Sequence, residues 1–228
     1  MNDRVFLITG ASSGIGAATA RAAHRHDYQL VLAARSADKL EALAREFGPE
    51  KVLTVSCDVT SMEDQRAMVE QAVERFGRLD VVFANAGRGG SPGGFSEADH
   101  HAWRDMLLTN VYGVGLTIQA TLPELRRSHG HILLTGSAAG RATIPGSMYS
   151  ASKWAVSGIG YNLREELRGS GIRVTLIEPG MVDTPFFDQV PENALEARDI
   201  ANAVMYAVDQ PAHVDVNEIL VRPTPPRD

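Results

Sequence analysis

Short runs of apolar residues alternate along this chain with longer segments in which apolar side chains recur every three or four positions. Most of the runs are continuous, as is typical of parallel strands buried on both faces. They predict strands at 5–9, 29–34, 51–56, 79–84, 130–135, 173–178 and 218–221. The periodic segments predict helices at 15–26, 37–47, 62–76, 100–127, 150–168 and 197–209. This alternation predicts an α/β fold, a doubly wound parallel sheet with helices on both faces.

Composition adds limits to this picture. No linker, low-complexity tract or repeat interrupts the pattern, so we expect one domain over residues 1–228. A formal net charge of −6 offers no basic surface, which argues against nucleic acid or an anionic membrane as partner. The apolar residues 5–8 are too few for a signal segment or membrane span. The single cysteine, Cys57, fits a reducing compartment, so we expect a cytoplasmic protein.

The turn after the first predicted strand has the sequence TGASSGIG, residues 9–16. Its glycines let the backbone turn tightly and approach a ligand closely. The helix that follows offers unpaired N–H groups and a positive dipole end to a pyrophosphate. Glycines at this position, between a strand and a helix, indicate a dinucleotide site. The expected cofactor contacts in this turn are Gly10, Ser12, Ser13, Gly14, Ile15 and Gly16.

The end of the second predicted strand bears on which nicotinamide cofactor binds. Sites for NAD carry an acidic residue here that binds the ribose 2′-hydroxyl. This chain has Ala34 in that place, followed by Arg35, whose guanidinium can pair with a 2′-phosphate. We therefore predict NADP(H) rather than NAD(H), while a solvated arginine at a strand end is the alternative for Arg35.

Tyr149 and Lys153 lie four residues apart in a predicted helix, so their side chains share one face. A positive charge beside a phenol favours the phenolate and lowers its pKa toward neutrality. The pair therefore fits a general acid/base. An ordinary amphipathic helix that carries both residues by chance is the alternative.

These motifs together resemble the short-chain dehydrogenase/reductase family. The matching residues, in the order and near the spacing usual for the family, are TGASSGIG at 9–16, Asn85-Ala86-Gly87, Asn110, Ser137, Tyr149, Lys153 and Pro179-Gly180. The resemblance covers about residues 4–185 and implies a Rossmann-type sheet of about seven strands in the order 3-2-1-4-5-6-7. The chain's ending is more similar to the branch of NADP-dependent reductases and 3-hydroxy-acid or amino-alcohol dehydrogenases.

The resemblance implies a catalytic role for four residues. Tyr149 would protonate the carbonyl oxygen as hydride arrives, or remove the alcohol proton in reverse. Lys153 would lower the pKa of Tyr149 and bind the nicotinamide ribose, and Ser137 would bind the substrate oxygen. Asn110 would hold a water that links Lys153 to solvent. For Asn110 taken alone, a helix-surface residue is the alternative.

Further cofactor contacts follow from the resemblance. Asp58 and Val59 would meet the adenine, and Asn85, Ala86 and Gly87 the adenosine ribose, with Asn85 also bracing the central strands. The residues expected beside the nicotinamide are Pro179, Gly180, Val182 and Thr184. Asp58 and Thr184 also precede helical segments, so each is a candidate helix cap as well.

The substrate is expected to contact mostly apolar side chains. With Ser137, these candidates are Ala139, Ile144, Met148, Met181, Phe186 and Phe187. They favour a ketone or aldehyde with a hydrophobic portion, and the short segment after Thr184 favours an open cleft. Arg88 and Arg141 follow site motifs and are either ligands of a substrate carboxylate or phosphate, or structural arginines.

The seven histidines suggest no metal site, because none has a matching set of Cys or carboxylate ligands, and we expect solvated structural side chains. We expect Cys57 to be a small core residue. By resemblance, helices 100–127 and 150–168 would form a homodimer or homotetramer. The predicted function is an NADP(H)-dependent oxidoreductase that interconverts a ketone or aldehyde and an alcohol. A 3-hydroxy-acid or amino-alcohol dehydrogenase, another reaction on the same scaffold, and a non-catalytic NADP-binding regulator stay open as alternatives.

Overall fold

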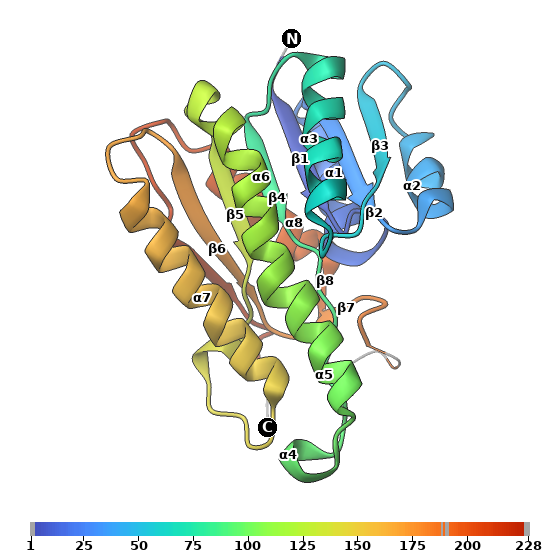
Figure 1. The fold of residues 1–228 in the computed structure, drawn as a ribbon, viewed down its shortest axis with the longest axis vertical. Coiled ribbons are helices and arrows are strands. Elements are labelled where there is room, and N and C mark those ends of the chain that lie inside the picture. Colours follow the sequence, from blue (N-terminus) through green and yellow to red (C-terminus); the bar gives the residue numbers. More distant parts are fainter. Residues whose placement is uncertain (1–2, 188, 190–191, 226–228) are drawn as a thin grey trace.

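A seven-stranded parallel sheet forms the centre of the molecule in the computed structural model, which describes residues 3–187, 189 and 192–225 (Figure 1). The sheet has the order β3-β2-β1-β4-β5-β6-β9. Its strands are β1 (Val5–Thr9), β2 (Gln29–Ala34), β3 (Val52–Ser56), β4 (Val81–Ala84), β5 (His131–Thr135), β6 (Arg173–Pro179) and β9 (Glu218–Val221). This confirms the predicted strands and their order. Two short paired strands, β7 (Val182–Asp183) and β8 (Leu195–Glu196), precede the last strand and were not predicted.

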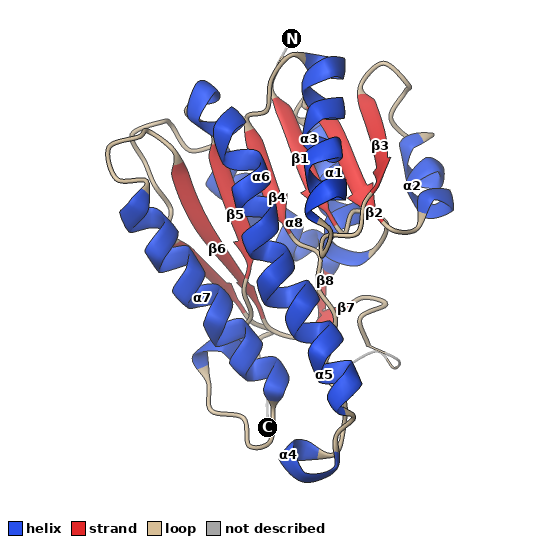
Figure 2. Cartoon of the chain, in the orientation of Figure 1, coloured by secondary structure: helices blue, strands red, loops and turns tan. Residues whose placement is uncertain are grey.

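Helices cover both faces of the sheet, as a doubly wound fold requires (Figure 2). One hydrophobic core lies between the sheet and α1 (Gly14–Arg25), α2 (Ala37–Ala44) and α8 (Ala197–Val208). The core on the opposite face lies against α3 (Met62–Phe76), α6 (Gly113–Ser128) and α7 (Met148–Glu166). The remaining α-helices of the described residues are α4 (Gly94–Glu97) and α5 (His100–Leu107).

The continuous apolar runs have a simple structural cause, which strand β1 illustrates. Successive side chains of a strand point to opposite faces of the sheet. Phe6 and Ile8 lie in the core beneath α1, α2 and α8, whereas Val5 and Leu7 lie in the core beneath α3, α6 and α7. Because both faces are covered, no position of β1 is available for a solvated polar side chain.

The segment predicted as one helix over 100–127 is interrupted. Between α5 and α6 the backbone forms a π-helix, η1 (Leu108–Tyr112), in which the Gly113 N–H donates to the Leu108 carbonyl oxygen. Such π-turns insert one residue into a helix and recur at functional sites. The insertion changes which side chains face inward, and Asn110 lies within it. Searched over the described residues, no helix is both long and apolar enough to span a membrane.

Candidate active and cofactor-binding site

A cleft of about 1120 Å³ runs along the edge of the sheet where its parallel strands end. Its walls come from the turn after β1, the end of β2, the loops after β3, β4 and β5, the start of α7, and the segments after β6 and β9. Open α/β sheets bind ligands at this edge. The volume is of the size that cofactor and ligand clefts have.

The glycine turn is closely packed beneath the cleft. Gly10 and Gly14 have φ angles of +63° and +51°, a backbone conformation that other residues rarely adopt. A Cβ atom at Gly16 would lie 2.3 Å from the Gly10 carbonyl oxygen. Gly10, Ser12, Ser13, Gly14 and Ile15 line the cleft, whereas Gly16 does not. Gly16 therefore permits close packing of the turn on α1, and its predicted contact with a cofactor stays a prediction.

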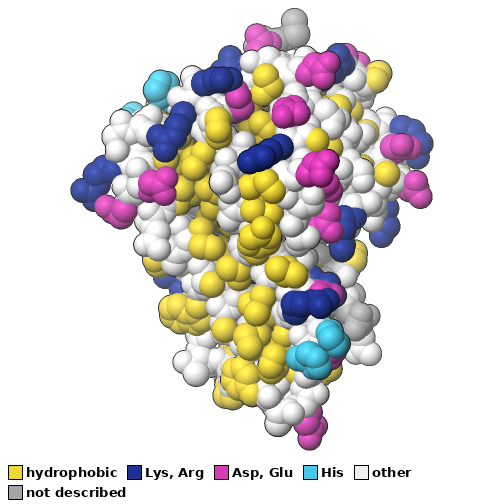
Figure 3. Space-filling model, viewed as in Figure 1, with side chains coloured by type: hydrophobic (Ala, Val, Ile, Leu, Met, Phe, Trp, Pro, Cys, Tyr) yellow, Lys and Arg dark blue, Asp and Glu magenta, His cyan; other side chains and the backbone are white. Residues whose placement is uncertain are grey.

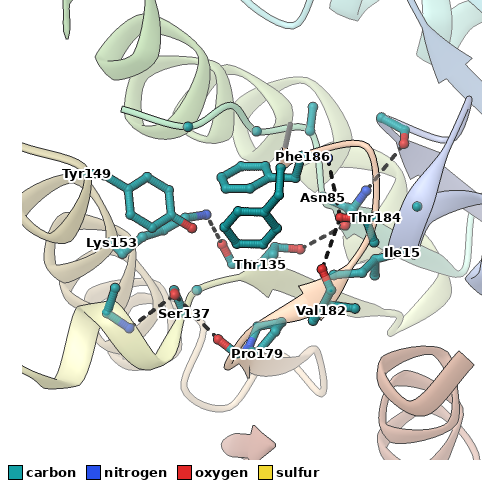
Figure 4. A pocket seen from close by; sticks show the side chains of 18 of the residues that line it. Ile15, Asn85, Thr135, Ser137, Tyr149, Lys153, Pro179, Val182, Thr184 and Phe186 are labelled. Carbon is teal, nitrogen blue, oxygen red and sulfur yellow. Dashed lines mark hydrogen bonds between the residues drawn. The ribbon is translucent and has the colours of Figure 1, made fainter. Parts of the chain in front are cut away.

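Asn85 holds this turn to the middle of the sheet. Its Nδ2 donates to the Thr9 carbonyl oxygen at 3.1 Å, and its Oδ1 accepts from Thr135 Oγ1 at 3.3 Å (Figure 4). The Thr9 hydroxyl in turn accepts from the backbone N–H groups of Asn85 and Ala86 at 3.0 and 3.1 Å. Asn85 therefore joins the ends of β1, β4 and β5, which confirms its predicted bracing of the central strands.

Arg35 lies at the far end of the cleft, which it lines together with Ala34 and Ser36. Its side chain is exposed, and within the described residues it forms no hydrogen bond or ion pair. The carboxylate of Asp58 also lines this end and accepts from the Thr60 N–H and hydroxyl at 2.9 and 2.8 Å. These two bonds, helped by the charge of Arg35, hold the pKa of Asp58 below its usual value.

The alternative of a helix cap at Asp58 is wrong, because Ser61 accepts from Asp64 N at the start of α3. The loop after β3 keeps a second contact through Val59. Its side chain lines the cleft, and its carbonyl oxygen accepts from Gln65 Nε2 at 3.0 Å.

Ser137 and Tyr149 meet on the opposite side of the cleft (Figure 4). Ser137 follows β5 and precedes a single 3₁₀ turn, η2 (Ala138–Arg141). The Ser137 hydroxyl accepts from the Ala139 N–H at 3.1 Å and donates to the Pro179 carbonyl oxygen at 3.4 Å. Its hydrogen bond with the Tyr149 hydroxyl lowers the pKa of that phenol. The structure therefore brings together the two side chains predicted to bind the substrate oxygen.

Lys153 is buried, and its Nζ donates to the Thr135 carbonyl oxygen at 2.8 Å. Burial lowers the pKa of Lys153 from 10.5 to about 8. The same Nζ lies 5.7 Å from the centre of the Tyr149 ring. Burial raises the pKa of Tyr149, and its hydrogen bond with Ser137 opposes this only in part. Burial is the larger effect on the pKa of Tyr149, and the expected lowering of that pKa by Lys153 stays a prediction.

Asn110 lies in the π-turn with its side chain turned inward, and only 1% of the residue is exposed. Its Oδ1 accepts from the Arg88 N–H at 2.9 Å, and its Nδ2 donates to the Arg88 carbonyl oxygen at 3.0 Å. The alternative of a helix-surface residue is therefore wrong. A Cβ at Gly87 would lie 3.4 Å from Asn110 Oδ1 and 3.9 Å from Lys153 Nζ, so only a glycine separates the two side chains. The water between them stays a prediction.

All but one of the residues predicted to contact the nicotinamide or the substrate line the cleft. Pro179, Gly180, Val182 and Thr184 line it, as do the predicted ribose contacts Ala86 and Gly87 and the substrate candidates Ala139, Ile144, Met181, Phe186 and Phe187. Met148 does not. It precedes Tyr149 in α7, and adjacent helical residues point about 100° apart, so the two side chains leave the helix in different directions.

An aromatic group covers the Tyr149 side of the cleft. The Phe186 ring lies 5.7 Å from that of Tyr149 and 5.2 Å from that of Phe187. Lining residues that the sequence did not indicate include Thr109, Thr135, the segment 89–92, Leu220, Arg222 and Pro223. The segment 89–92 carried a signal in its glycines and proline directly after a strand, whereas Arg222 carried none.

The two uncertain arginines both have structural partners. Arg88 lies outside the cleft lining and has an ion pair with Asp105 at 3.6 Å. Arg141 lines the cleft, but its guanidinium is bound to Glu178 and Glu218. Cys57 is buried, which raises the pKa of its thiol to about 12 and confirms the predicted core position.

His131 corrects the prediction of solvated histidines. It is 1% exposed on β5, and its Nε2 lies 2.7 Å from Thr175 Oγ1. Because the Thr175 hydroxyl donates to the Val216 carbonyl oxygen at 2.6 Å, Nε2 is the protonated nitrogen of the ring. Burial holds the pKa of His131 well below 6.5. In the part of the chain that the structure describes, no group of three His, Cys, Asp or Glu side chains is placed to hold a metal ion.

Comparison with known proteins agrees with this arrangement. The family described as short chain dehydrogenase matches residues 4–195. An uncharacterized oxidoreductase of Staphylococcus saprophyticus is 41% identical over 231 residues, which cover 98% of each chain. The alcohol dehydrogenase from the archaeon Thermococcus sibiricus, solved with 5-hydroxy-NADP, has 34% identity and a TM-score of 0.90, covering 99% of this chain and 98% of its own.

The 3-ketoacyl-(acyl-carrier-protein) reductase from Brucella melitensis, solved with NADH, has 27% identity and a TM-score of 0.89 over 96% of each chain. Similar structures thus include complexes with either type of nicotinamide cofactor. From the family match, the identity over nearly the whole chain and the shared sheet order, the chain belongs to the short-chain dehydrogenase/reductase family of oxidoreductases.

Proposed function

We propose that the protein is an NADP(H)-dependent oxidoreductase that interconverts a ketone or aldehyde and the corresponding alcohol, acting through one domain over residues 1–228. One observation carries the proposal. A single cleft has the glycine turn and Arg35 at one end, and Ser137, Tyr149 and Lys153 at the other. A dinucleotide laid along it would bring its nicotinamide to the only part of the lining where a serine, a tyrosine and a lysine converge.

The residues of the cleft fit such a cofactor. Gly10 and Gly14 line the cleft at the start of α1, where no side chain caps the N–H groups of the first turn and these groups can bind a pyrophosphate. Asp58 and Val59 would meet the adenine, Ala86 and Gly87 the ribose, and Val182 and Thr184 the nicotinamide. Arg35 supports NADP(H), because its guanidinium forms no hydrogen bond or ion pair among the described residues and no acidic residue takes the place of Ala34.

The mechanism follows from the protonation states that the site favours. A bound nicotinamide supplies or accepts the hydride. Since burial raises the pKa of Tyr149, its hydroxyl holds a proton at neutral pH and is suited to donate it to a carbonyl oxygen. Ser137 would hold that oxygen in place. Lys153, with a pKa near 8, would return a proton to Tyr149, and a water held by Asn110 would link Lys153 to solvent, from which that proton is replaced.

The cleft lining supports a neutral substrate with a hydrophobic portion, since it includes Ile144, Met181 and two phenylalanines, of which Phe186 lies 5.7 Å from the Tyr149 ring. A 3-hydroxy acid is a second candidate because of Arg222. That arginine is exposed, lines the cleft and lies beside Gly180, so it is placed to meet a carboxylate. We rank the neutral carbonyl compound first, because Phe186 packs on the Tyr149 ring and most of the predicted substrate contacts that line the cleft are apolar.

Association through the helices of one face is part of the proposal. Figure 3 shows hydrophobic side chains gathered along the face that α5, α6 and α7 form. Leu108, Tyr112, Trp154 and Tyr161 of these helices and the π-turn are each at least 38% exposed. This supports a homodimer or homotetramer built on helices 100–127 and 150–168, and light scattering that reports a monomer would contradict it. A cytoplasmic location remains the expectation from Cys57.

NADPH oxidation in the presence of a panel of ketones, aldehydes and 3-oxo acids tests the proposed function, with NADH measured in parallel. We expect turnover of neutral ketones or aldehydes with NADPH. Turnover of 3-oxo acids alone would favour the second candidate. Cofactor binding without turnover of any member would favour a non-catalytic regulator, and better turnover with NADH would contradict the NADP(H) assignment.

A further inference from the structure

Arg141 is bound to two acidic residues that lie far from it in the chain. Its Nε donates to the two carboxylate oxygens of Glu178 at 2.8 and 2.9 Å, and its Nη2 lies 2.8 Å from Glu178 Oε2. Nη2 also donates to Glu218 of β9. The Glu178 side chain is fully buried, and Ser157 Oγ donates to it at 3.2 Å. A buried carboxylate needs such partners, because an unpaired charge in the protein interior is strongly destabilising.

The pair ties the η2 turn to the sheet. Arg141 is the last residue of η2, and Ser137 is the residue that caps its start. Glu178 immediately precedes Pro179, whose carbonyl oxygen accepts the bond from Ser137. The ion pair and the serine hydroxyl thus attach the two ends of one turn to adjacent residues of β6.

Helix α7 holds the same turn from the other side. Ser150 Oγ donates to the Ala139 carbonyl oxygen at 2.7 Å and to that of Ala142 at 3.2 Å. The η2 turn packs closely against α7, since a Cβ at Gly140 would lie 2.8 Å from the Lys153 carbonyl oxygen. Tyr149 and Lys153 are on this helix, so the turn connects Ser137 to both.

We propose that Arg141 and Glu178 are positioning residues that hold Ser137 against Tyr149, and that this ion pair sets the geometry of the substrate oxygen site. The proposal rests on the function proposed above. Ser137's own bond to β6 is long, at 3.4 Å, so the charged bonds of Arg141 supply the firmer attachment. It follows that Arg141, although it lines the cleft, is not available to a substrate carboxylate.

Arg141→Lys is the first variant. It keeps a charge for buried Glu178 but loses the two-pronged geometry of the guanidinium. Arg141→Gln combined with Glu178→Gln removes both charges together, which avoids a buried unpaired carboxylate if the single change does not fold. The matched control is Arg21→Lys, because Arg21 binds Glu46 in the same two-pronged way at 2.7 Å on the far side of the molecule.

Steady-state kinetics of these variants, with and without Ser137→Ala, separates positioning from general structure. We expect Arg141→Lys to lower kcat about 10-fold or more while the Kd for NADPH changes less than about 2-fold. In the Ser137→Ala background the same change should have almost no effect, because Arg141 acts through Ser137. A kcat within about 2-fold of wild type, or an equal loss in the Ser137→Ala background, would overturn the proposal.

A second measurement does not depend on turnover, so it separates this proposal from the proposed function. Tyrosine labelled with carbon-13 at Cζ reports ionisation of each phenol by NMR, and Tyr149→Phe identifies the Tyr149 signal. Lys153 and Phe186, which lie beside the Tyr149 ring, are not substituted in these variants. We expect Arg141→Lys and Ser137→Ala to raise the pKa of Tyr149 alike, because each loses the hydrogen bond from Ser137. An unchanged titration in Arg141→Lys beside a shifted one in Ser137→Ala would refute the positioning role even if no substrate is turned over.

Discussion

Lys153 directs its ammonium group at the carbonyl oxygen of Thr135, 2.8 Å away, inside a nearly water-free part of the cleft wall. The bond joins α7 to the end of β5, and with it the helix that carries Tyr149 to the strand that precedes Ser137. A single hydrogen bond to a carbonyl does not replace the hydration of a charge. Burying the charged Lys153 side chain therefore lowers the free energy of unfolding of the protein.

This cost gives a prediction for Lys153→Met, a change that keeps the length of the side chain without its charge. At pH 7 both the folded and the unfolded chain carry the charge, so we expect the variant to gain about 1–3 kcal/mol in free energy of unfolding. Above pH 8 the folded wild type loses its proton, while the unfolded chain keeps it up to 10.5, so wild-type stability rises. Urea unfolding at pH 7 and pH 9.5 checks this, and an equal gain at both values would contradict it.

Arg35→Ala is expected to weaken the binding of NADPH about 10–100-fold, because a charged hydrogen bond to the 2′-phosphate is lost. NADH lacks that phosphate, so its Kd should change less than about 3-fold. Isothermal titration measures both. Lys39→Ala provides the control, since Lys39 is an exposed cation near Arg35 that does not line the cleft. Equal losses for the two cofactors would place Arg35 elsewhere than at the phosphate.

Gly16→Ala tests the packing of the phosphate-binding turn. The new Cβ would lie 2.3 Å from the Gly10 carbonyl oxygen, so the turn must shift. We expect a loss of about 1–3 kcal/mol in stability and at least about 10-fold weaker binding of NADPH. Gly115→Ala is the comparison, because no atom lies within 4 Å of its Cβ and alanine favours the helix. A Gly16→Ala variant that binds NADPH normally would show that the turn tolerates displacement.

His131 predicts a loss of stability in acid. Its folded pKa lies well below 6.5, so below pH 6.5 the unfolded chain takes up a proton that the folded chain refuses. Between pH 7 and pH 5 we expect wild type to lose about 1–2 kcal/mol more than His131→Gln, whose amide can still donate to Thr175. Urea unfolding at both values measures the difference, and parallel losses would mean that His131 does not titrate on unfolding.

Sequence alone predicted much of the fold, because strands buried on both faces leave unbroken apolar runs. It did not reveal the π-turn at Asn110, since one inserted residue barely changes helical periodicity over 100–127. The partners of Arg141 were equally hidden, because Glu178 and Glu218 follow it by 37 and 77 residues. The upward shift of the Tyr149 pKa was hidden for a related reason: spacing places Lys153 beside the phenol, but burial is a property of the whole fold.

Tyr149→Phe is the sharpest test of Tyr149 as the proton donor, because the change removes one oxygen atom and leaves the ring packed against Phe186. The measurement is kcat for NADPH oxidation with the best ketone of the panel, together with the Kd for NADPH. If Tyr149 donates the proton, we expect kcat to fall about 10²–10⁴-fold while the Kd for NADPH stays within about 3-fold of wild type. A variant that retains more than about a tenth of the wild-type turnover while binding NADPH normally would contradict the assignment of Tyr149 as the proton donor.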